Sequence, residues 1–273
     1  MTNNHLVISL YNESNISRAL ELLYCLRENL NNKYITKVHI LMENGDKTNY
    51  FLSDCINELM VTFGEKDKIK IIPFNGRPTF NDYFEYCNKN IEGNAIVANS
   101  DIVYDDTLNK IENIVENEFI VLTRYQKYDD TFKIFHFTDK DKNAIKILNN
   151  KVNIFSQDTW IFKSPMYDNI DIPMFVGSMF SDGFINYKLS TSKFKVYNKA
   201  KFIRSYHIQK EPSLSETITQ DETHNIWSEL HNLTKHETKD FVYGVPLQEL
   251  DGHQENPINV KHFLNATTSY YME

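Results

Sequence analysis

A polar triplet, Asn99-Ser100-Asp101, interrupts an apolar run that extends over residues 95–104. A buried strand that ends there places the oxygen-bearing side chains of Asn99 and Asp101 on alternate residues, where a sheet meets solvent. Carboxylate and amide oxygens suit hard cations such as Mg²⁺ and Mn²⁺, and ligands of open α/β sheets collect at the carboxyl ends of the strands. The triplet therefore indicates a cation site, although a strand followed by an Asx-type turn, with Asp105 as a helix cap, explains the same residues.

The elements that must position this triplet follow from apolar patterns along the first half of the chain. We expect strands at residues 6–10, 37–42, 69–73, 95–98 and 119–123, and helices at residues 15–31, 56–63, 79–88 and 106–115. In the first helix the expected cap is Ser14, and the expected apolar face comprises Ile16, Leu20, Leu23 and Leu30. Strands that alternate with helices indicate βαβ units and a mainly parallel sheet.

The pattern becomes less regular in the second half of the chain. Strands are expected at residues 133–137 and 158–162, and a helix at residues 184–189 after a glycine-containing loop at 177–183. We divide the chain into a domain over residues 1–210, with halves at 1–125 and 126–210, and a more polar C-terminal extension at 211–273. The extension is expected to pack against the core or against a partner.

Composition and charge exclude several classes of protein. The chain of 273 residues is 41% hydrophobic, which is enough for a sizeable core, and its net charge of -8 gives no reason to expect a nucleic-acid partner. No stretch reaches bilayer length and the first residues do not form a signal peptide, so no transmembrane segment is expected. Three widely spaced cysteines, Cys25, Cys55 and Cys87, favour reduced thiols and a cytoplasmic, reducing compartment. The oligomeric state stays open.

The motifs at the ends of the expected elements, in their order along the chain, resemble those of nucleotide-sugar-dependent glycosyltransferases of the GT-A fold. The resemblance covers roughly residues 5–210 and lies in these segments: VISLYNE at 7–13, MEN at 42–44, NSD at 99–101, SQDTW at 156–160, FSDG at 180–183 and RSYH at 204–207. It implies a GT-A-like Rossmann-type sandwich with a mainly parallel central sheet, in which a nucleotide-binding half precedes an acceptor-side half.

The resemblance also implies a Mn²⁺ or Mg²⁺ ion that bridges the donor diphosphate. Asp101 would be a metal ligand, and His207 falls where many members carry a late histidine ligand. Asn99 stands where the family more often has aspartate, which implies either a weaker metal affinity than usual or a site with Asp101 as the sole direct protein carboxylate. Magnesium tolerates such a site because it binds through one or two carboxylates together with phosphates and water. A histidine hydrogen-bonded in the core is the alternative for His207.

Three further residues are expected to contact the donor. Tyr11 and Glu43, at the ends of the first two strands, resemble positions near the base and ribose. Simple packing of Tyr11 and a solvated strand end at Glu43 are the alternatives. Arg77 lies in the loop NGRPTF directly before a helix, where a rigid loop can direct a guanidinium at a phosphate. Arg124 and Arg204 are the alternatives for this phosphate contact, and a solvated role is equally compatible with Arg77.

A carboxylate is needed to accept the proton of the attacking hydroxyl if the transfer inverts configuration. Asp182 is the preferred catalytic base, because it precedes the last expected helix, although it is also placed to cap that helix. Asp158 is the second candidate, and Trp160 beside it is suited either to stacking on a sugar or to the core.

We therefore expect a metal-assisted, inverting transfer of sugar from a nucleotide-sugar donor to a glycan or other hydroxyl acceptor. No P-loop, Gly-x-Gly-x-x-Gly, His-Glu-x-x-His or Gly-x-Ser-x-Gly motif is present, which disfavours kinases, dehydrogenases, zincins and α/β-hydrolases. A non-catalytic nucleotide- or carbohydrate-binding module on the same scaffold remains an alternative. A sugar-phosphate nucleotidyltransferase is disfavoured, because residues 11–14 lack the glycine-rich, basic loop that such an enzyme needs.

Overall fold

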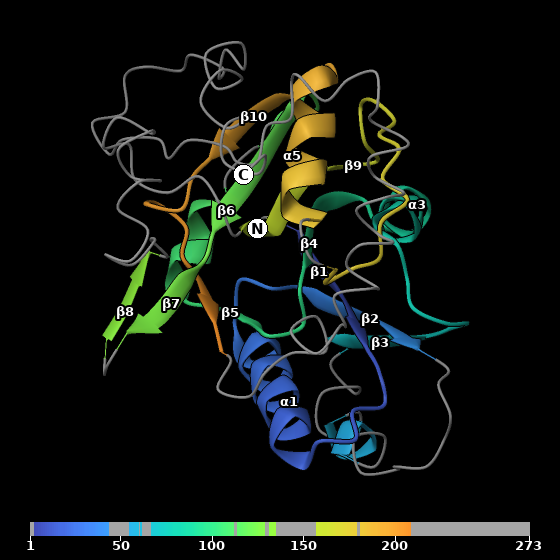
Figure 1. Ribbon diagram of the computed structural model, residues 1–273, viewed down its shortest axis with the longest axis vertical. Helices are drawn as coiled ribbons and strands as arrows, with labels where there is room; N and C mark the ends of the chain where they lie inside the picture. The colour runs from blue at the N-terminus through green and yellow to red at the C-terminus, as the bar shows by residue number, and fades with distance from the viewer. Residues whose placement is uncertain are drawn as a thin grey trace, which may run out of the picture.

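The computed structural model describes residues 3–43, 55–59, 61, 67–111, 114–128, 131–134, 157–178 and 181–208. The expected extension at 211–273 and the proposed boundary at residue 210 lie outside these residues. The described elements follow one another along the chain in this order (Figure 1): β1 (Asn4–Leu10), α1 (Ile16–Asn31), β2 (Lys37–Glu43), β3 (Ile69–Phe74), α3 (Phe80–Asn90), β4 (Gly93–Ala98), β5 (Ile102–Tyr104), η1 (Asp106–Lys110), β6 (Glu118–Thr123), β7 (Tyr125–Tyr128), β8 (Thr131–Ile134), β9 (Gln157–Ser164), α5 (Ser181–Thr191), β10 (Lys195–Asn198) and β11 (Ser205–His207).

The central sheet has seven described strands in the order β10-β6-β9-β4-β1-β2-β3. The pairs β4-β1, β1-β2, β2-β3 and β10-β6 are parallel, whereas β9 runs antiparallel to both of its neighbours, β4 and β6. The expectation of a mainly parallel sheet is confirmed. Because β9 runs the other way, its first residues lie at the same edge as the carboxyl ends of the parallel strands.

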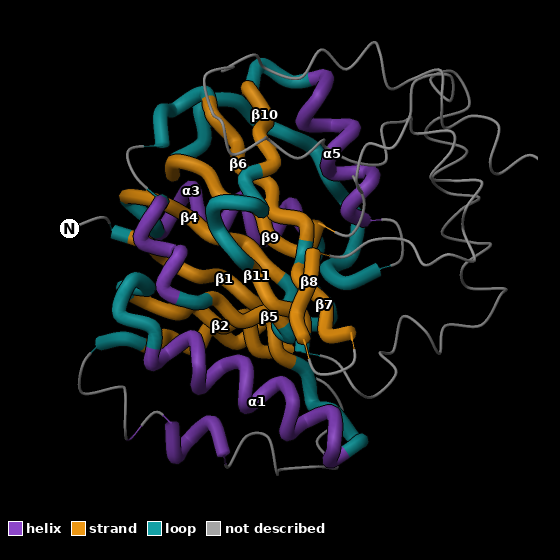
Figure 2. Tube along the Cα trace, turned by 90° about the vertical axis from the view of Figure 1, so that its left-hand side faces the viewer, coloured by secondary structure: helices purple, strands orange, loops and turns teal. Residues whose placement is uncertain are grey.

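Alternate side chains of the strands fill two hydrophobic clusters, one on each face of the sheet. Leu6, Ile8 and Leu10 of β1 belong to the cluster beneath α1, and Val7 belongs to the cluster that contains side chains of α3 and α5. This alternation follows from the two-residue period of a strand. The result is a three-layer α/β/α arrangement, in which α1 lies along one side of the sheet (Figure 2).

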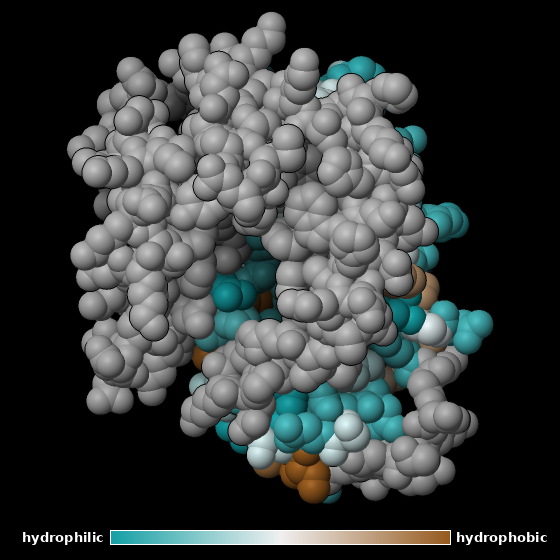
Figure 3. Space-filling view, in the orientation of Figure 1, coloured by the Kyte–Doolittle hydropathy of each residue, from teal (hydrophilic) through white to brown (hydrophobic). Residues whose placement is uncertain are grey.

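Helix α1 differs from the expectation in its cap and in its buried face. Asn15 rather than Ser14 is the N-cap, since its side chain accepts a hydrogen bond from the backbone N–H of Arg18 at 3.3 Å. The buried face includes Leu22 and Leu26 as well as Leu30. The expected apolar face was therefore wrong in part, because Ile16 is 58% and Leu20 51% exposed. Brown atoms at the lower end of Figure 3 lie where Figure 1 places the start of α1.

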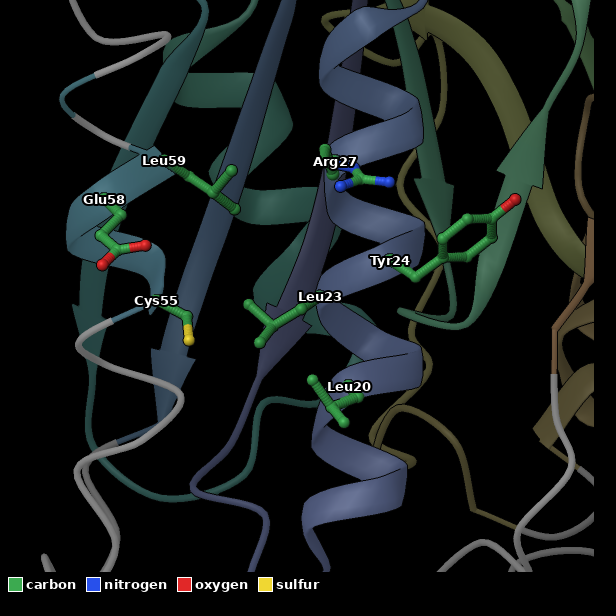
Figure 4. A pocket seen from close by; sticks show the side chains of 7 residues that line it. All are labelled: Leu20, Leu23, Tyr24, Arg27, Cys55, Glu58 and Leu59. Atoms are coloured by element: carbon green, nitrogen blue, oxygen red, sulfur yellow. The ribbon is translucent and has the colours of Figure 1, made fainter.

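The outer face of α1 borders a second helical segment, residues 55–59. Figure 4 shows Leu20 and Leu23 of α1 facing Cys55 and Leu59 of that segment. A surface groove of about 410 Å³ lies between the two, with Tyr24, Arg27 and Glu58 completing its lining. Its lining combines three leucines with a tyrosine, a cysteine and two charged side chains, and it contains none of the residues expected to do chemistry.

A smaller second sheet, in the order β5-β11-β7-β8, adjoins the central one. The sequence predicted a helix at 106–115, but the chain forms the short strand β5 and then a single 3₁₀ turn, η1. Asp105 does cap that turn, as expected, by accepting a hydrogen bond from Thr107 N. Strand β8 starts two residues before the expected strand 133–137, whose last three residues lie outside the described part.

Helix α5 is longer than predicted and includes residue 182 in its first turn, so Asp182 lies inside the helix rather than in a loop before it. Cys25, Cys55 and Cys87 carry thiols and form no disulfide, and Cys25 and Cys87 are buried. No helix in the described ranges combines the length and the apolar character required to cross a bilayer.

Candidate functional site

Polar and charged side chains gather at the edge of the sheet where the parallel strands end. They come from the end of β2, from the segments that follow β1, β3, β4 and β6, from the start of β9, from the first turn of α5 and from β11 of the second sheet. Ligands of open α/β sheets bind at this edge, so the folded chain brings the candidate residues to the expected place. They form three groups of contacts.

The first group is centred on Asp101, in the turn between β4 and β5. Its Oδ2 lies 2.5 Å from Nη2 of Arg18 and 3.3 Å from Nε2 of His207. Antiparallel pairing of β5 with β11 sets Ile102 opposite His207, and the backbone N–H of Ile208 donates to the Asp101 carbonyl at 2.9 Å. The short second sheet therefore holds the aspartate and the histidine together across more than one hundred residues of sequence.

Asp101 is buried, with only 7% of the residue exposed. Burial alone would raise its pKa, but the nearby His207 and Arg18 outweigh burial and hold the pKa of Asp101 well below its usual range. Its second oxygen, Oδ1, is buried and has no hydrogen-bond partner among the described residues. A buried carboxylate oxygen without a partner is a feature of a site that awaits another ligand.

Asp101 and His207 fit a hard divalent cation. Two adjacent ligands of an octahedral ion, each at about 2.1 Å, lie about 3 Å apart, which is close to the 3.3 Å between Oδ2 of Asp101 and Nε2 of His207. The described residues contain no group of three or more histidines, cysteines and acids that could hold an ion by themselves. Such an ion would therefore take its other ligands from water and from the phosphates of a substrate.

Asp158 is the centre of the second group. Its Oδ1 accepts a hydrogen bond from Nδ2 of Asn99 at 2.9 Å, and its Oδ2 pairs with Nη1 of Arg124 at 3.1 Å. Asn99, expected to bind cofactor, thus directs its amide nitrogen to Asp158 and not to Asp101. Both oxygens of Asp158 are engaged by nitrogen donors, an arrangement that suits an orienting role better than proton transfer.

Asp182 lies on the first turn of α5, and the N–H of Gly183 donates to its Oδ1 at 2.8 Å. One turn further on, the buried Asn186 donates to Gln157 of β9 at 2.8 Å, and Gln157 donates to Thr123 of β6 at 3.0 Å. This network fixes the start of α5 against the sheet edge. Burial lowers the pKa of Arg124, but the charges of Asp158, Asp101 and Asp182 outweigh burial and raise it.

The third group lies near the ends of β2 and β3. Burial raises the pKa of Glu43 to about 7, although the positive charge of Arg77 opposes the shift. Arg77 donates from Nε and Nη2 to the carbonyl of Val176, at 3.0 and 2.6 Å. The guanidinium expected to bind phosphate thus holds the backbone of the segment that leads to α5.

Tyr11 follows β1 and donates its hydroxyl to Oε2 of Glu13 at 2.9 Å. Burial, reinforced by Glu13, raises the pKa of Tyr11, while nearby Arg18 lowers it. Trp160 is 1% exposed and packs against Phe80 with ring centroids 5.1 Å apart, so it belongs to the core and does not stack on a sugar.

The principal residue that the sequence did not reveal is Arg18. A cation in the first turn of a helix opposes the helix macrodipole, and this conflict was the available signal. Of the two alternatives to Arg77, Arg124 pairs with Asp158, and Arg204 pairs with Asp105 at 2.6 Å.

Comparisons with known proteins place the fold. No family model and no curated protein matches the chain. Among solved structures, the chain is similar to GalNAc-T7 in complex with UDP, GalNAc and Mn²⁺, with 13% identity, 88% of this chain covered and a TM-score of 0.51. The match to HddC from Yersinia pseudotuberculosis has 16% identity and covers 60% of this chain and 77% of HddC. The match to the galactosyltransferase LgtC, in complex with donor and acceptor sugar analogs, has 12% identity and covers 58% of this chain and 57% of LgtC.

The TM-scores of HddC and LgtC, 0.38 and 0.35, are too low to support an argument. The likeness to GalNAc-T7, together with the seven-stranded, mainly parallel sheet, shows a GT-A-like fold. The predicted fold class is confirmed. The chain spans half the length of GalNAc-T7.

Proposed function

We propose that the protein is a glycosyltransferase that moves a sugar from a nucleotide-sugar donor to the hydroxyl of a glycan or other acceptor. The observation that carries the proposal is the gathering of Asp101, His207, Asp158 and Asp182 at the ligand-binding edge of a GT-A-like sheet. The likeness to GalNAc-T7, whose structure contains UDP, GalNAc and Mn²⁺, supports this class of reaction.

Asp101 and His207 would hold a Mn²⁺ or Mg²⁺ ion in this proposal. When bound, such an ion neutralises charge on the departing diphosphate. The residues of the chain supply the rest of the site. Glu43 and Tyr11 flank the region assigned to the base and ribose, and Arg77 anchors the adjoining loop through the Val176 carbonyl.

Asp182 is the proposed catalytic base for an inverting transfer. It lies on a helix that polar contacts fix to the sheet edge, whereas both oxygens of Asp158 are engaged by nitrogen donors. A carboxylate in that position accepts the proton of the acceptor hydroxyl as the new glycosidic bond forms. Asp158, held by Asn99 and Arg124, would orient the sugar between the cation site and the base Asp182.

The test is a thermal-shift screen of UDP-, GDP-, CMP- and dTDP-sugars, each with and without Mn²⁺ or Mg²⁺. A ligand that binds only the folded state raises its melting temperature. We expect one nucleotide class to raise the melting temperature only when the cation is present, and we expect Asp101→Asn to abolish this rise. With that donor the unaltered protein should transfer sugar to an acceptor. The Asp182→Asn variant should lose sugar transfer but keep the rise in melting temperature that the donor causes.

Absence of a shift with every donor would contradict the proposal and favour a non-catalytic binding module. A shift without turnover in the unaltered protein, across a panel of hydroxyl acceptors, would also favour that module. An Asp182→Asn variant with normal turnover would remove Asp182 as the base and leave the donor site intact.

A further inference from the structure

Arg18 is a buried charge for which the proposed reaction has no use. It is 4% exposed, and burying an ionised guanidinium is strongly unfavourable unless partners compensate it. It also lies in the first turn of α1, where the helix macrodipole disfavours a cation. Helix stability therefore does not explain its position, and its contacts must.

The guanidinium has an acidic partner on each terminal nitrogen. Nη1 lies 2.9 Å from Oε2 of Glu21, one turn further along the same helix, and Nη2 lies 2.5 Å from Oδ2 of Asp101. Burial would lower the pKa of Arg18, but the two acids outweigh burial and raise it. Arg18 is thus a permanent positive charge fixed against one oxygen of Asp101.

That oxygen is the one that faces His207. A cation held by Asp101 and His207 together lies within a few ångströms of Oδ2, whichever carboxylate oxygen it binds, because Nε2 of His207 is 3.3 Å from this atom. The guanidinium already contacts it, so a divalent ion would be only a few ångströms from a fixed positive charge in a poorly solvated setting. Like charges at that separation repel strongly.

We propose that Arg18 is the counter-ion of Asp101 in the cation-free protein and that it weakens divalent-cation binding at this carboxylate. The inference rests on the proposed function only in taking Asp101 and His207 as cation ligands. Arg18 is therefore a residue that sets cation affinity, and its neutral replacement must tighten binding.

The experiment is a titration with Mn²⁺ alone, in which free Mn²⁺ is followed by electron paramagnetic resonance. Arg18→Gln and Arg18→Met remove the charge with side chains of similar length, and circular dichroism identifies which of them folds. Arg27→Gln is the matched control, because it removes a positive charge from the same helix at a site where the Arg27 side chain is 59% exposed. Asp101→Asn tests the ligand itself.

We expect the neutral Arg18 variants to bind Mn²⁺ at least about tenfold more tightly than the unaltered protein, with no such change in Arg27→Gln. Appearance of binding where the unaltered protein shows none supports the proposal equally. Unchanged or weaker binding in folded Arg18 variants, with binding still lost in Asp101→Asn, overturns this inference alone. Binding that survives in Asp101→Asn, or that is absent from all proteins, overturns both the inference and the proposed cation site.

Discussion

His39 of β2 makes the folded protein sensitive to acid because its ring is buried in the neutral form. The ring is 3% exposed and lies in a chain of hydrogen bonds, with its Nε2 2.9 Å from Nδ1 of His5 and its Nδ1 2.8 Å from the hydroxyl of Tyr86. Burial, reinforced by His5 and nearby lysines, lowers the pKa of His39 to about 3. The folded state thus holds this ring neutral.

The sign of the effect follows from linkage. In the unfolded chain the ring titrates near its ordinary value of 6.5, so between that pH and about 3 the unfolded state binds a proton that the folded state does not. The stability contributed by the neutral ring is complete above pH 6.5 and is lost as the pH falls. At pH 5 the loss is about 2 kcal/mol, and any folded-state pKa below about 4 gives nearly the same figure.

The assay is urea denaturation at pH 8 and pH 5, applied to the unaltered protein and to His39→Gln. The variant should lose about 2 kcal/mol less between the two pH values, which corresponds to roughly 4–8 °C in melting temperature. Tyr86→Phe is the control, because it removes a hydrogen-bond partner but leaves the titrating ring buried, and it should keep the full pH dependence. Equal losses in the unaltered protein and His39→Gln would refute the reasoning.

Three other predictions concern stability. Arg124→Met leaves the buried carboxylate of Asp158 without its guanidinium and should reduce the free energy of unfolding by about 2–3 kcal/mol. The side chain of Arg204 is 43% exposed, so Arg204→Met should change this free energy by less than about 1 kcal/mol. Similar losses for the two variants in denaturant titrations would contradict this prediction. Burial raises the pKa of Glu43 above its unfolded value, so the contribution of Glu43 to folding stability is most favourable below pH 4.5 and is lost as the pH rises towards 7. Glu43→Gln should therefore stabilise the folded protein at pH 8 but not at pH 4. Melting curves at the two pH values check the sign of the effect. Gly93→Ala should cost about 2 kcal/mol or more, because residue 93 has φ +133° and a Cβ there would lie 2.6 Å from a backbone oxygen; an unchanged melting temperature would contradict it.

The sequence predicted six of the seven described strands of the central sheet, because each of the six is a short apolar run bounded by polar residues. It missed β10, which has only four residues. It predicted the α1 face poorly because that helix carries two apolar stripes. Periodicity shows that Leu20 and Leu26 are apolar positions of a helix, but it does not show which stripe faces the sheet. Burial of Asn29, which donates to the Ile102 carbonyl at 2.7 Å, decides the orientation through a contact 73 residues away.

In the candidate site, too, the sequence predicted some features and missed others. Residue types at strand ends pointed to Asp101, Asp158 and His207, and the fold brings these residues to one edge. Their partners could not be read from the sequence, because the pairs Arg18–Asp101 and Arg124–Asp158 join residues 83 and 34 positions apart. Short strands such as β5 and β11, three residues each, carry too little pattern to be predicted alone.

The antiparallel strand β9 has a consequence for how the chain is assembled on the ribosome. Strands β1 to β4 can pair among themselves as soon as residue 98 has been synthesised, but β6 pairs only with β9 and β10 among the described strands. Until residues 157–164 emerge, the outer edge of β4 and both edges of β6 therefore lack their native partners. Unpaired edges invite association with other chains, so the interval before β9 is the period in which a nascent chain is most exposed to aggregation.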